Sequence, residues 1–317
     1  MSILKTDYKD DVINEELASD RKFGEVNNED GTKSYTDVTP YRQEGDEYGA
    51  KEINFENTHT NYAIEAADRT YEGVDLTMRF AEEIAQFPNP WRWIKTRIAA
   101  VNFDGLHVGD YIPIYIGDQL IKMQIAGVDT YYNCDSQMHH IDWISKECFD
   151  TTIRWSTSST PNNNGNANEN CPYNKSNVKS QLNSLVSELP VEIQEVVSSK
   201  RFLLESRYAA SQTLTESTSY EWCDLGKLWL PSEYEVVGAG VWSSMPYGAG
   251  AAVQYPIFAN SLKNRIKMSG DTPGNWWTLS VCGGSPALCC YINDTGISSS
   301  APTNAPMRVP ICFRISE

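Results

Sequence analysis

The residue types that most often carry out enzymatic chemistry are few in this chain of 317 residues, and they are not grouped. The histidines are His59, His107, His139 and His140, and none is spaced with a carboxylate or a cysteine as a metal site requires. His139 and His140 are adjacent and would point to opposite faces of an extended segment. We expect both to be surface residues. Glycine-flanked nucleophilic serines, phosphate-binding loops and dinucleotide-binding loops are absent from the sequence. We therefore expect no catalytic residues, no metal, no cofactor and no enzyme activity.

The cysteines do not form a zinc motif either. None of the eight belongs to a Cys-x-x-Cys pair, and a disulfide framework is typical of a short secreted chain. We expect most of them to be buried free thiols that pack as small hydrophobic residues. They are Cys134, Cys148, Cys171, Cys223, Cys282, Cys289, Cys290 and Cys312.

Two further residue types could indicate a ligand site. Glu233 and Glu235 lie on one short predicted helix, but Ser232 and Glu235 have the spacing of a capping box, which gives Glu235 a structural role. The chain has nine tryptophans, which could stack on sugars. Trp229, Trp276 and Trp277 lie in apolar strand patterns, however, so core packing is the favoured interpretation of these three.

The charge distribution excludes some partners. Aspartate and glutamate number 42 against 26 lysines and arginines, which gives a net charge of −16. Residues 1–88 hold 21 acidic and 9 basic side chains, so most of the acidity lies in the first quarter. We expect no nucleic-acid partner and no anionic membrane partner, because both attract basic patches. No stretch is apolar enough for a secretion signal or a membrane span, so we expect assembly in a cytoplasm and no membrane insertion.

The first ninety residues are expected to differ from the rest. Residues 1–48 are acidic and poor in aliphatic side chains, which predicts an extended arm that becomes ordered against a partner. Residues 49–90 have helical spacing with a break near Tyr71–Gly73, and Pro88 and Pro90 are expected to end the helical pattern. A solvated helix pair and a helical bundle between identical subunits are both open interpretations.

Residues 91–317 are rich in aromatic and β-branched residues and predict an α+β domain. Helices are expected at 178–189, 191–197, 232–237 and 255–267, and a polar loop at 156–170. In the last predicted strand, Val309, Ile311, Phe313 and Ile315 share one face, and Cys312 and Arg314 lie on the other. Strands are expected at 98–103, 111–116, 120–126, 141–144, 200–208, 227–230, 276–282, 287–292 and 309–315.

Several of these segments together resemble a known family. They are residues 227–236 (Lys-Leu-Trp-Leu-Pro-Ser-Glu-Tyr-Glu-Val), 254–258, Trp276-Trp277 and 309–315. They resemble the C-type-lectin-like domains at the C-terminal end of structural proteins of tailed bacteriophages. Residues 230–235 (Leu-Pro-Ser-Glu-Tyr-Glu) also look like the matching turn and helix of formylglycine-generating enzymes and of phage tropism determinants. The resemblance implies two helices that flank a twisted antiparallel sheet.

The resemblance also implies which residues form the scaffold and which face a ligand. In tropism determinants, the segment between the Trp-Trp strand and the last strand binds the ligand, and in some a diversity-generating retroelement rewrites it. Here that segment is 278–308. The scaffold positions would be Trp276, Trp277, Leu279, Val281, Val309, Phe313 and Arg314. The ligand-facing candidates would be Thr278, Cys282, Leu288, Tyr291, Asn293, Asp294, Ile297, Asn304, Met307 and Arg308.

Residues 4–12, 30–39 and 48–58 resemble a leader module of tail-fibre and other virion proteins. The resemblance therefore implies a homotrimeric phage virion protein of tail-fibre or receptor-binding type. Its arm would bind other virion proteins, and its display domain would bind a protein or glycan receptor on the host. The alternatives are a capsid or neck decoration or head-fibre protein, and an enzyme on the formylglycine-generating-enzyme fold. The chain lacks the calcium motifs of calcium-dependent lectins, and Cys289 and Cys290 do not reproduce the active-site pair of that enzyme.

Overall fold

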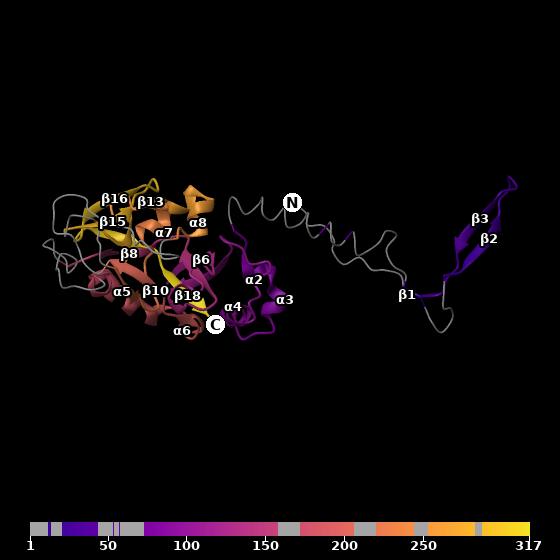
Figure 1. Cartoon of the computed structure of the whole chain (residues 1–317), viewed down its shortest axis with the longest axis horizontal. Helices are drawn as coiled ribbons and strands as arrows, with labels where there is room; N and C mark the ends of the chain where they lie inside the picture. The colour runs from indigo at the N-terminus through magenta and orange to yellow at the C-terminus, as the bar shows by residue number, and fades with distance from the viewer. Residues whose placement is uncertain are drawn as a thin grey trace. The chain divides into compact units, whose positions relative to one another are not determined.

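The structure is a computed structural model that describes residues 12–13, 21–43, 53, 57, 73–157, 172–205, 220–243, 253–282 and 287–317 (Figure 1). The contacts between residues divide the chain into two units, Met1–Arg69 and Thr70–Glu317. The helices expected at 49–72 fall almost entirely outside the described residues. Apart from residues 53 and 57, the described part of the 49–90 region begins at residue 73, and that part belongs to the second unit. The division between the units therefore falls before residue 70 and not at residue 90.

The described part of the first unit consists of two short strand pairs. Strand β1 (Val12–Ile13) pairs antiparallel with β4 (Tyr41–Gln43), and β2 (Phe23–Asn27) forms a hairpin with β3 (Lys33–Asp37). The side chains of Phe23 and Tyr35 on this hairpin are 59% and 66% exposed. The predicted arm thus contains β structure, but its described residues bury no core of their own.

The second unit begins with three helices, α2 (Leu76–Arg79), α3 (Ala81–Ile84) and α4 (Pro90–Ala99). Pro90 starts α4 and does not end a helical region, because a proline in the first turn needs no backbone hydrogen-bond partner. The side chain of Asn89 caps this helix by accepting a hydrogen bond from the Arg92 amide. The strand predicted at 98–103 is wrong, since its first residues complete α4.

One five-stranded sheet has the order β5-β6-β7-β18-β9, and every neighbouring pair in it is antiparallel. The hairpin predicted from residues 111–126 is confirmed as β5 and β6. Strand β18, near the C-terminus, lies beside β7, so the end of the chain is in the centre of this sheet. The strands are β5 (Tyr111–Ile116), β6 (Gln119–Val128), β7 (His140–Ser145), β18 (Cys312–Ser316) and β9 (Val197–Ser198).

The second five-stranded sheet has the order β16-β15-β14-β17-β8. Strands β14 and β17 are parallel and the other pairs are antiparallel. The strands predicted at 276–282 and 287–292 are confirmed as β14 and β15. The strands are β8 (Phe149–Arg154), β14 (Trp276–Val281), β15 (Leu288–Ile292), β16 (Ser298–Pro302) and β17 (Pro306–Val309).

The predicted last strand, residues 309–315, is split between the two sheets. Val309 ends β17 in one sheet and Cys312 begins β18 in the other. Cys312 and Arg314 are buried as completely as Phe313 and Ile315. The expectation of one core face and one outer face is therefore wrong, because β18 is a central strand that is covered on both sides.

The remaining elements are short. The amphipathic helix predicted at 178–189 is confirmed as α5, which Ser176 caps and a 3-10 turn (η4) extends. Of the strand predicted at 200–208, residues 201–205 are observed, Lys200 directly precedes the strand, and residues 206–208 lie outside the described residues. The strand predicted at 227–230 is a single bridge between Trp229 and Cys312. The other elements are η1 (Cys134–Ser136), η3 (Pro172–Lys175), α5 (Asn177–Leu185), η4 (Val186–Glu188), α6 (Val191–Gln194), β10 (Arg201–Glu205), β11 (Tyr220–Asp224), α7 (Glu233–Val237), α8 (Pro256–Asn260), η5 (Leu262–Arg265), β12 (Lys267–Ser269) and β13 (Thr272–Gly274).

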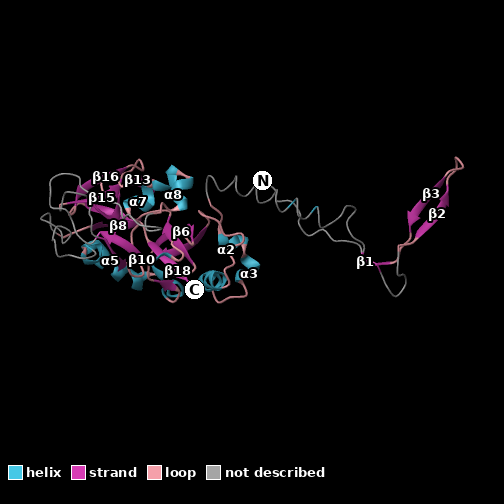
Figure 2. Ribbon diagram, viewed as in Figure 1, coloured by secondary structure: helices cyan, strands magenta, loops and turns pink. Residues whose placement is uncertain are grey.

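The second unit is rich in sheet, with few and short helices, which is a mixed arrangement compatible with the α+β class (Figure 2). Its buried hydrophobic residues form one cluster that contacts both five-stranded sheets. Among the described residues, no helix is long and apolar enough to cross a membrane.

Candidate functional site

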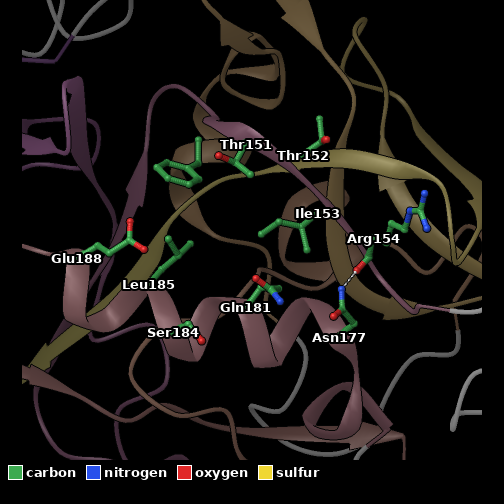
Figure 3. Close-up of a pocket in the computed structure, with 10 residues that line it drawn as sticks. Thr151, Thr152, Ile153, Arg154, Asn177, Gln181, Ser184, Leu185 and Glu188 are labelled. Carbon is green, nitrogen blue, oxygen red and sulfur yellow. Dashed lines mark hydrogen bonds between the residues drawn. The ribbon is translucent and has the colours of Figure 1, made fainter.

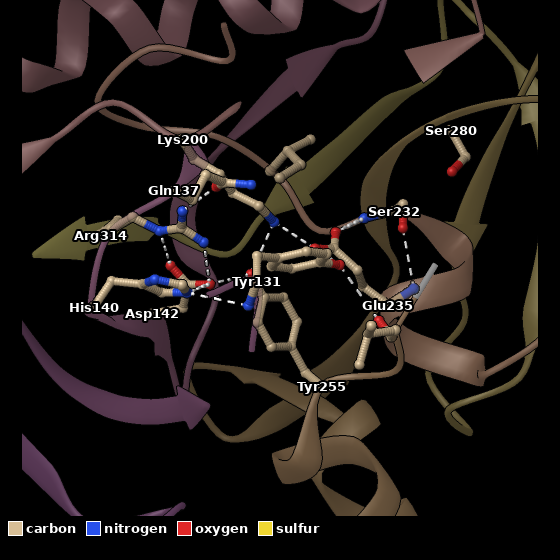
Figure 4. Close-up of polar contacts among 12 residues, drawn as sticks. Tyr131, Gln137, His140, Asp142, Lys200, Ser232, Glu235, Tyr255, Ser280 and Arg314 are labelled. Carbon is tan, nitrogen blue, oxygen red and sulfur yellow. Dashed lines mark hydrogen bonds and ion pairs between the residues drawn. The ribbon is translucent and has the colours of Figure 1, made fainter. Parts of the chain in front are cut away.

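A network of buried polar side chains lies in the core of the second unit (Figure 4). It joins segments that are far apart in the sequence, because each member comes from a different element or loop. Tyr131 follows β6, Lys200 precedes β10, and Tyr255 precedes α8. Asp142 lies on β7 and Arg314 on β18. All of these side chains are buried, with exposed fractions of 0–2%.

The ion pair between Asp142 and Arg314 joins two neighbouring strands at directly opposite positions. Arg314 donates from Nε to Oδ1 at 2.6 Å and from Nη2 to Oδ2 at 2.8 Å. The hydroxyl of Tyr255 donates to the same carboxylate at 2.7 Å. Burial alone would raise the pKa of Asp142, but the charge and hydrogen bonds of Arg314 outweigh burial and hold that pKa well below its usual value. Asp142 therefore stays ionised in the core.

The second ion pair lies between Lys200 and Glu235, where the ammonium donates to Oε1 of the carboxylate. The ammonium also donates to the hydroxyl of Tyr255 at 2.8 Å, and Tyr131 donates its hydroxyl to Glu235 at 2.8 Å. Burial lowers the pKa of Lys200, and the carboxylates of Glu235 and Asp142 oppose this effect. Four aromatic rings surround the ammonium, with centroids 4.0–5.0 Å away; they belong to Tyr131, Phe202, Trp229 and Tyr255.

The predicted surface position of His140 is wrong. This ring is fully buried, and its Nδ1 lies 2.7 Å from the carbonyl oxygen of Met138. The backbone amide of Tyr131 donates to its Nε2 at 3.3 Å, and burial lowers the pKa of the imidazole. His139 is partly buried and lies 2.7 Å from Asp129. The network side chains are almost completely buried, so their hydrogen bonds and ion pairs join the elements of the second unit to one another.

The two glutamates of α7 point to different parts of the molecule. Glu235 completes the predicted capping box with Ser232, which is confirmed, and also reaches Lys200. Glu233 is equally buried, but its carboxylate accepts from three successive backbone amides, at 241, 242 and 243, over 2.8–3.2 Å. The hydroxyls of Ser243 and Ser298 donate to it as well. Glu233 thus fixes the loop after α7 to strand β16.

Lys267 is another buried lysine, and it lies outside the two ion pairs described above. Lys267 is 1% exposed and donates to the carbonyl oxygen of Ser145. Its ammonium lies 6.0 Å and 5.8 Å from the ring centroids of Phe258 and Trp276. Among the described residues no carboxylate forms an ion pair with it. Burial lowers the pKa of this lysine.

The segment that was predicted to face a ligand is only partly on the surface. Thr278 and Cys282 are buried, and the hydroxyl of Thr278 donates to the carbonyl oxygen of Cys290 at 2.9 Å. Their predicted ligand-facing position does not agree with this burial, because the strand continues inward there as part of the core. Asp294 and Ile297 are exposed. The half-buried candidates are Leu288, Tyr291, Asn293, Asn304, Met307 and Arg308.

A closed turn presents the exposed part of this segment. The side-chain oxygen of Asn293 accepts hydrogen bonds from the amides of Thr295 and Ile297 and from the hydroxyl of Thr295, at 2.8–3.0 Å. Gly296 has a φ of +82°, which favours glycine. The turn holds the side chain of Ile297 outward with 63% of its surface exposed. The predicted scaffold positions beneath the segment are all buried: Trp276, Trp277, Leu279, Val281, Val309, Phe313 and Arg314.

The cysteines and possible metal ligands were also located. Of the seven cysteines that the structure describes, six are free and five of these are buried, whereas Cys223 is disulfide-bonded; Cys171 lies outside the described residues. Burial raises the pKa of Cys148 to about 12 and raises the pKa of Cys289 and Cys312 as well. No group of three or more metal-ligating side chains occurs within the part of the chain that the structure describes.

Comparison with known proteins gives one match. A sequence profile described as a domain of unknown function, DUF6273, matches residues 144–316, which is more than half of the chain. The chain belongs to the DUF6273 family. No curated protein and no solved structure matches it. The DUF6273 region begins at the end of β7 and includes Lys200, Glu233, Glu235 and Arg314, whereas Asp142 lies just before it.

The sequence patterns identified the helix cap at Ser232 but missed most of this arrangement. Lys200 and Asp142 carry no local signal, because their partners are at least 35 residues away along the chain. One signal in the sequence could have indicated the role of Glu233. The capping box accounts for Glu235 on this short helix, but it does not account for Glu233. The polar network and the Glu233 contacts are therefore known only from the folded chain.

Two of the buried lysines, Lys200 and Lys267, should respond in opposite ways to replacement by methionine. Lys200→Met leaves Glu235 buried without its cation and should lower the free energy of unfolding by about 3–5 kcal/mol. Lys267→Met removes a buried amine without orphaning a carboxylate, and should raise the free energy of unfolding at pH 7 by about 1 kcal/mol. Urea denaturation of both variants measures these changes.

The pH dependence provides a control for Lys267. Because its pKa is lowered in the folded state, folding opposes protonation at any pH below the ordinary lysine pKa of about 10.4. The advantage of Lys267→Met should therefore shrink as the pH rises towards that value. Equal destabilisation by both substitutions at pH 7 would contradict the distinction between the two sites.

Glu233 should control the loop after α7 without controlling the core. Glu233→Ala removes the acceptor of the amides of Val241, Trp242 and Ser243, so these amides should exchange with solvent deuterium about tenfold faster or more. The amides of β7 and β18 should keep their protection. Ser298→Ala is the matched control, because it removes one donor to the carboxylate and leaves the three amides paired. Unchanged exchange at 241–243 in Glu233→Ala would show that the loop is fixed by other contacts.

Proposed function

We propose that this protein is a phage virion component of tail-fibre or receptor-binding type, whose second unit displays a ligand-binding surface to the host cell. In this proposal residues 91–317 adopt a C-type-lectin-like fold. The mixed architecture, with short helices beside twisted antiparallel strands, is compatible with that fold. The resemblance of residues 227–236, Trp276-Trp277 and 309–315 to lectin-like phage domains supports it.

The observation that carries the proposal is the contrast between the two sides of the 278–308 segment. Its underlying strands are buried, with Trp276 and Trp277 in the core. Above them, the Asn293 turn holds Ile297 in an exposed position through bonds to the backbone. A surface whose shape is maintained by buried and backbone contacts can change its outward side chains without unfolding, as a recognition surface must.

The loop after α7 extends the same surface. Glu233 binds both the amides of residues 241–243 and the hydroxyl of Ser298, which directly follows Ile297. The indole of Trp242 donates to the carbonyl oxygen of Ser298 at 3.3 Å. The half-buried indole of Trp242 therefore lies beside the backbone of the residue that follows Ile297, and we propose that it belongs to the ligand-facing surface, where tryptophan is often enriched.

The first unit suits a role in assembly. It carries much of the negative charge of the chain, and its hairpin exposes Phe23 and Tyr35. A two-stranded hairpin is at best marginally stable alone in water, so a partner surface would stabilise it. We propose that other virion proteins, and the other subunits of a homotrimer, supply this surface.

Substitution of Ile297 tests the display surface. Ile297→Asp should reduce the binding of the purified full chain to host bacteria by about tenfold, since a desolvated apolar contact would be replaced by a charge. Val191→Asp is the matched control, because Val191 is equally exposed (64%) but lies on α6, outside the segment. Fluorescently labelled protein and competition with intact phage measure the binding. Equal binding by the two variants would place recognition elsewhere.

The oligomeric state tests the role of the first unit. Size-exclusion chromatography with light scattering should give three times the 35.6 kDa mass of one chain for the full-length protein. Phe23→Ser together with Tyr35→Ser should shift the protein towards the monomer, because both replaced side chains are exposed in the single chain. A full-length chain that remains monomeric at micromolar concentration would contradict the trimer.

A further inference from the structure

A groove of about 400 Å³ lies between strand β8 and helix α5 (Figure 3). None of its lining residues belongs to the 278–308 segment. From the helix and its 3-10 extension come Asn177, Gln181, Ser184, Leu185 and Glu188, spaced by four, three, one and three residues. This spacing places them on one face of the helix. The opposite wall consists of residues 149 and 151–154 of β8.

The groove combines an apolar base with polar walls. Ile153 and Leu185 are buried, and Phe149 is half-buried and packs against the core. Thr151, Thr152 and Gln181 are exposed, and within the described chain their side chains form no hydrogen bond. Glu188 and Arg154 lie at opposite ends of the groove in Figure 3. The lining thus offers hydroxyl, amide and carboxylate groups beside an aromatic ring, with one charge of each sign.

A peptide strand added to the sheet would be the usual occupant beside an edge strand such as β8. Two features oppose this here. The amide of Asp150 already donates to the side chain of Gln119, and the carbonyl oxygen of Arg154 accepts from the side chain of Asn177. The register with β17 also shifts between Met307 and Val309. Such irregularities protect edge strands from pairing, so the groove favours a ligand that binds side chains.

We propose that this groove binds an uncharged pyranose sugar unit. Its hydroxyl groups would exchange hydrogen bonds with Thr151, Thr152 and Gln181, and its apolar ring face would lie on Phe149. The balanced charges of Arg154 and Glu188 disfavour an anionic or a cationic ligand. The volume is at the small end of the range for ligand sites and suits one or two sugar rings. The site needs no metal ion, which accords with the missing calcium motifs.

This inference extends the proposed host-recognition function, because a glycan at the groove would be a second contact with the host cell. It is nevertheless separable from that function. The Ile297→Asp substitution should leave sugar binding at the groove unchanged. A change in the groove should leave the fold and the 278–308 surface intact.

The test uses saturation-transfer NMR and calorimetry of the full chain with the methyl glycosides of glucose, galactose, mannose and N-acetylglucosamine. Ser184→Tyr places a ring in the groove and should weaken the binding of the preferred glycoside by about tenfold or more. Ser180→Tyr is the matched control, because Ser180 is exposed on the same helix but does not line the groove. It should bind as the unsubstituted chain does.

Each outcome decides the question. Binding that Ser184→Tyr removes and Ser180→Tyr preserves supports the groove as a sugar site. Failure of all four glycosides to bind, or binding that Ser184→Tyr leaves unchanged, overturns it. Stronger binding of glucuronate than of glucoside would overturn the preference for an uncharged ligand. Sugar binding without attachment to host bacteria would count against the host-recognition function and not against the groove.

Discussion

The buried pair of Lys200 and Glu235 is the interaction on which the second unit depends. An ammonium in a protein core is costly to desolvate, and here one carboxylate, one phenol hydroxyl and four aromatic rings offset that cost together. Tyr255 links this pair to Asp142, and Asp142 holds Arg314 across two strands. Contacts of this kind are directional, so they specify how the sheets, α7 and α8 fit together more narrowly than apolar packing would.

Helix α7 connects the polar network to the surface although it is only five residues long. Its capping box sets the position of Glu235 in the core. Glu233, two residues earlier, then lies where its carboxylate accepts hydrogen bonds from the amides of the following loop. The proposed recognition surface and the polar core are therefore connected through one turn of helix. A substitution in residues 232–235 would disturb both regions, which explains why two acidic residues occur in an otherwise apolar helix.

Local patterns in the sequence were sufficient for many of the elements. The β5–β6 hairpin, helix α5 and the capping box of α7 each depend on neighbours in the chain, and each was predicted. The region at Pro88–Pro90 misled because a proline ends one helix and begins another equally well. The split between β17 and β18 could not be seen, since a continuous run of strand-forming residues gives no sign of a change of sheet.

The candidate sites were harder to predict for the same reason. The bulged pairing of β14 with β15 determines which residues of 278–308 are exposed. The sequence alone therefore could not show that Thr278 and Cys282 are buried and that Ile297 is exposed. The groove beside β8 arises from the packing of two segments with unremarkable sequences. Long-range pairs such as Asp142 with Arg314, 172 residues apart, leave no mark in either local pattern.

The buried free thiols have a consequence for the chemical stability of the protein in air. Oxidation of cysteine proceeds through the thiolate, and burial raises the pKa values of Cys148, Cys289 and Cys312 so that little thiolate forms. The thiols of Cys148, just before β8, of Cys289 on β15 and of Cys312 on β18 are thus protected from oxidation and from exchange with other thiols. We therefore expect Cys148, Cys289 and Cys312 to stay unmodified in air without an added reductant.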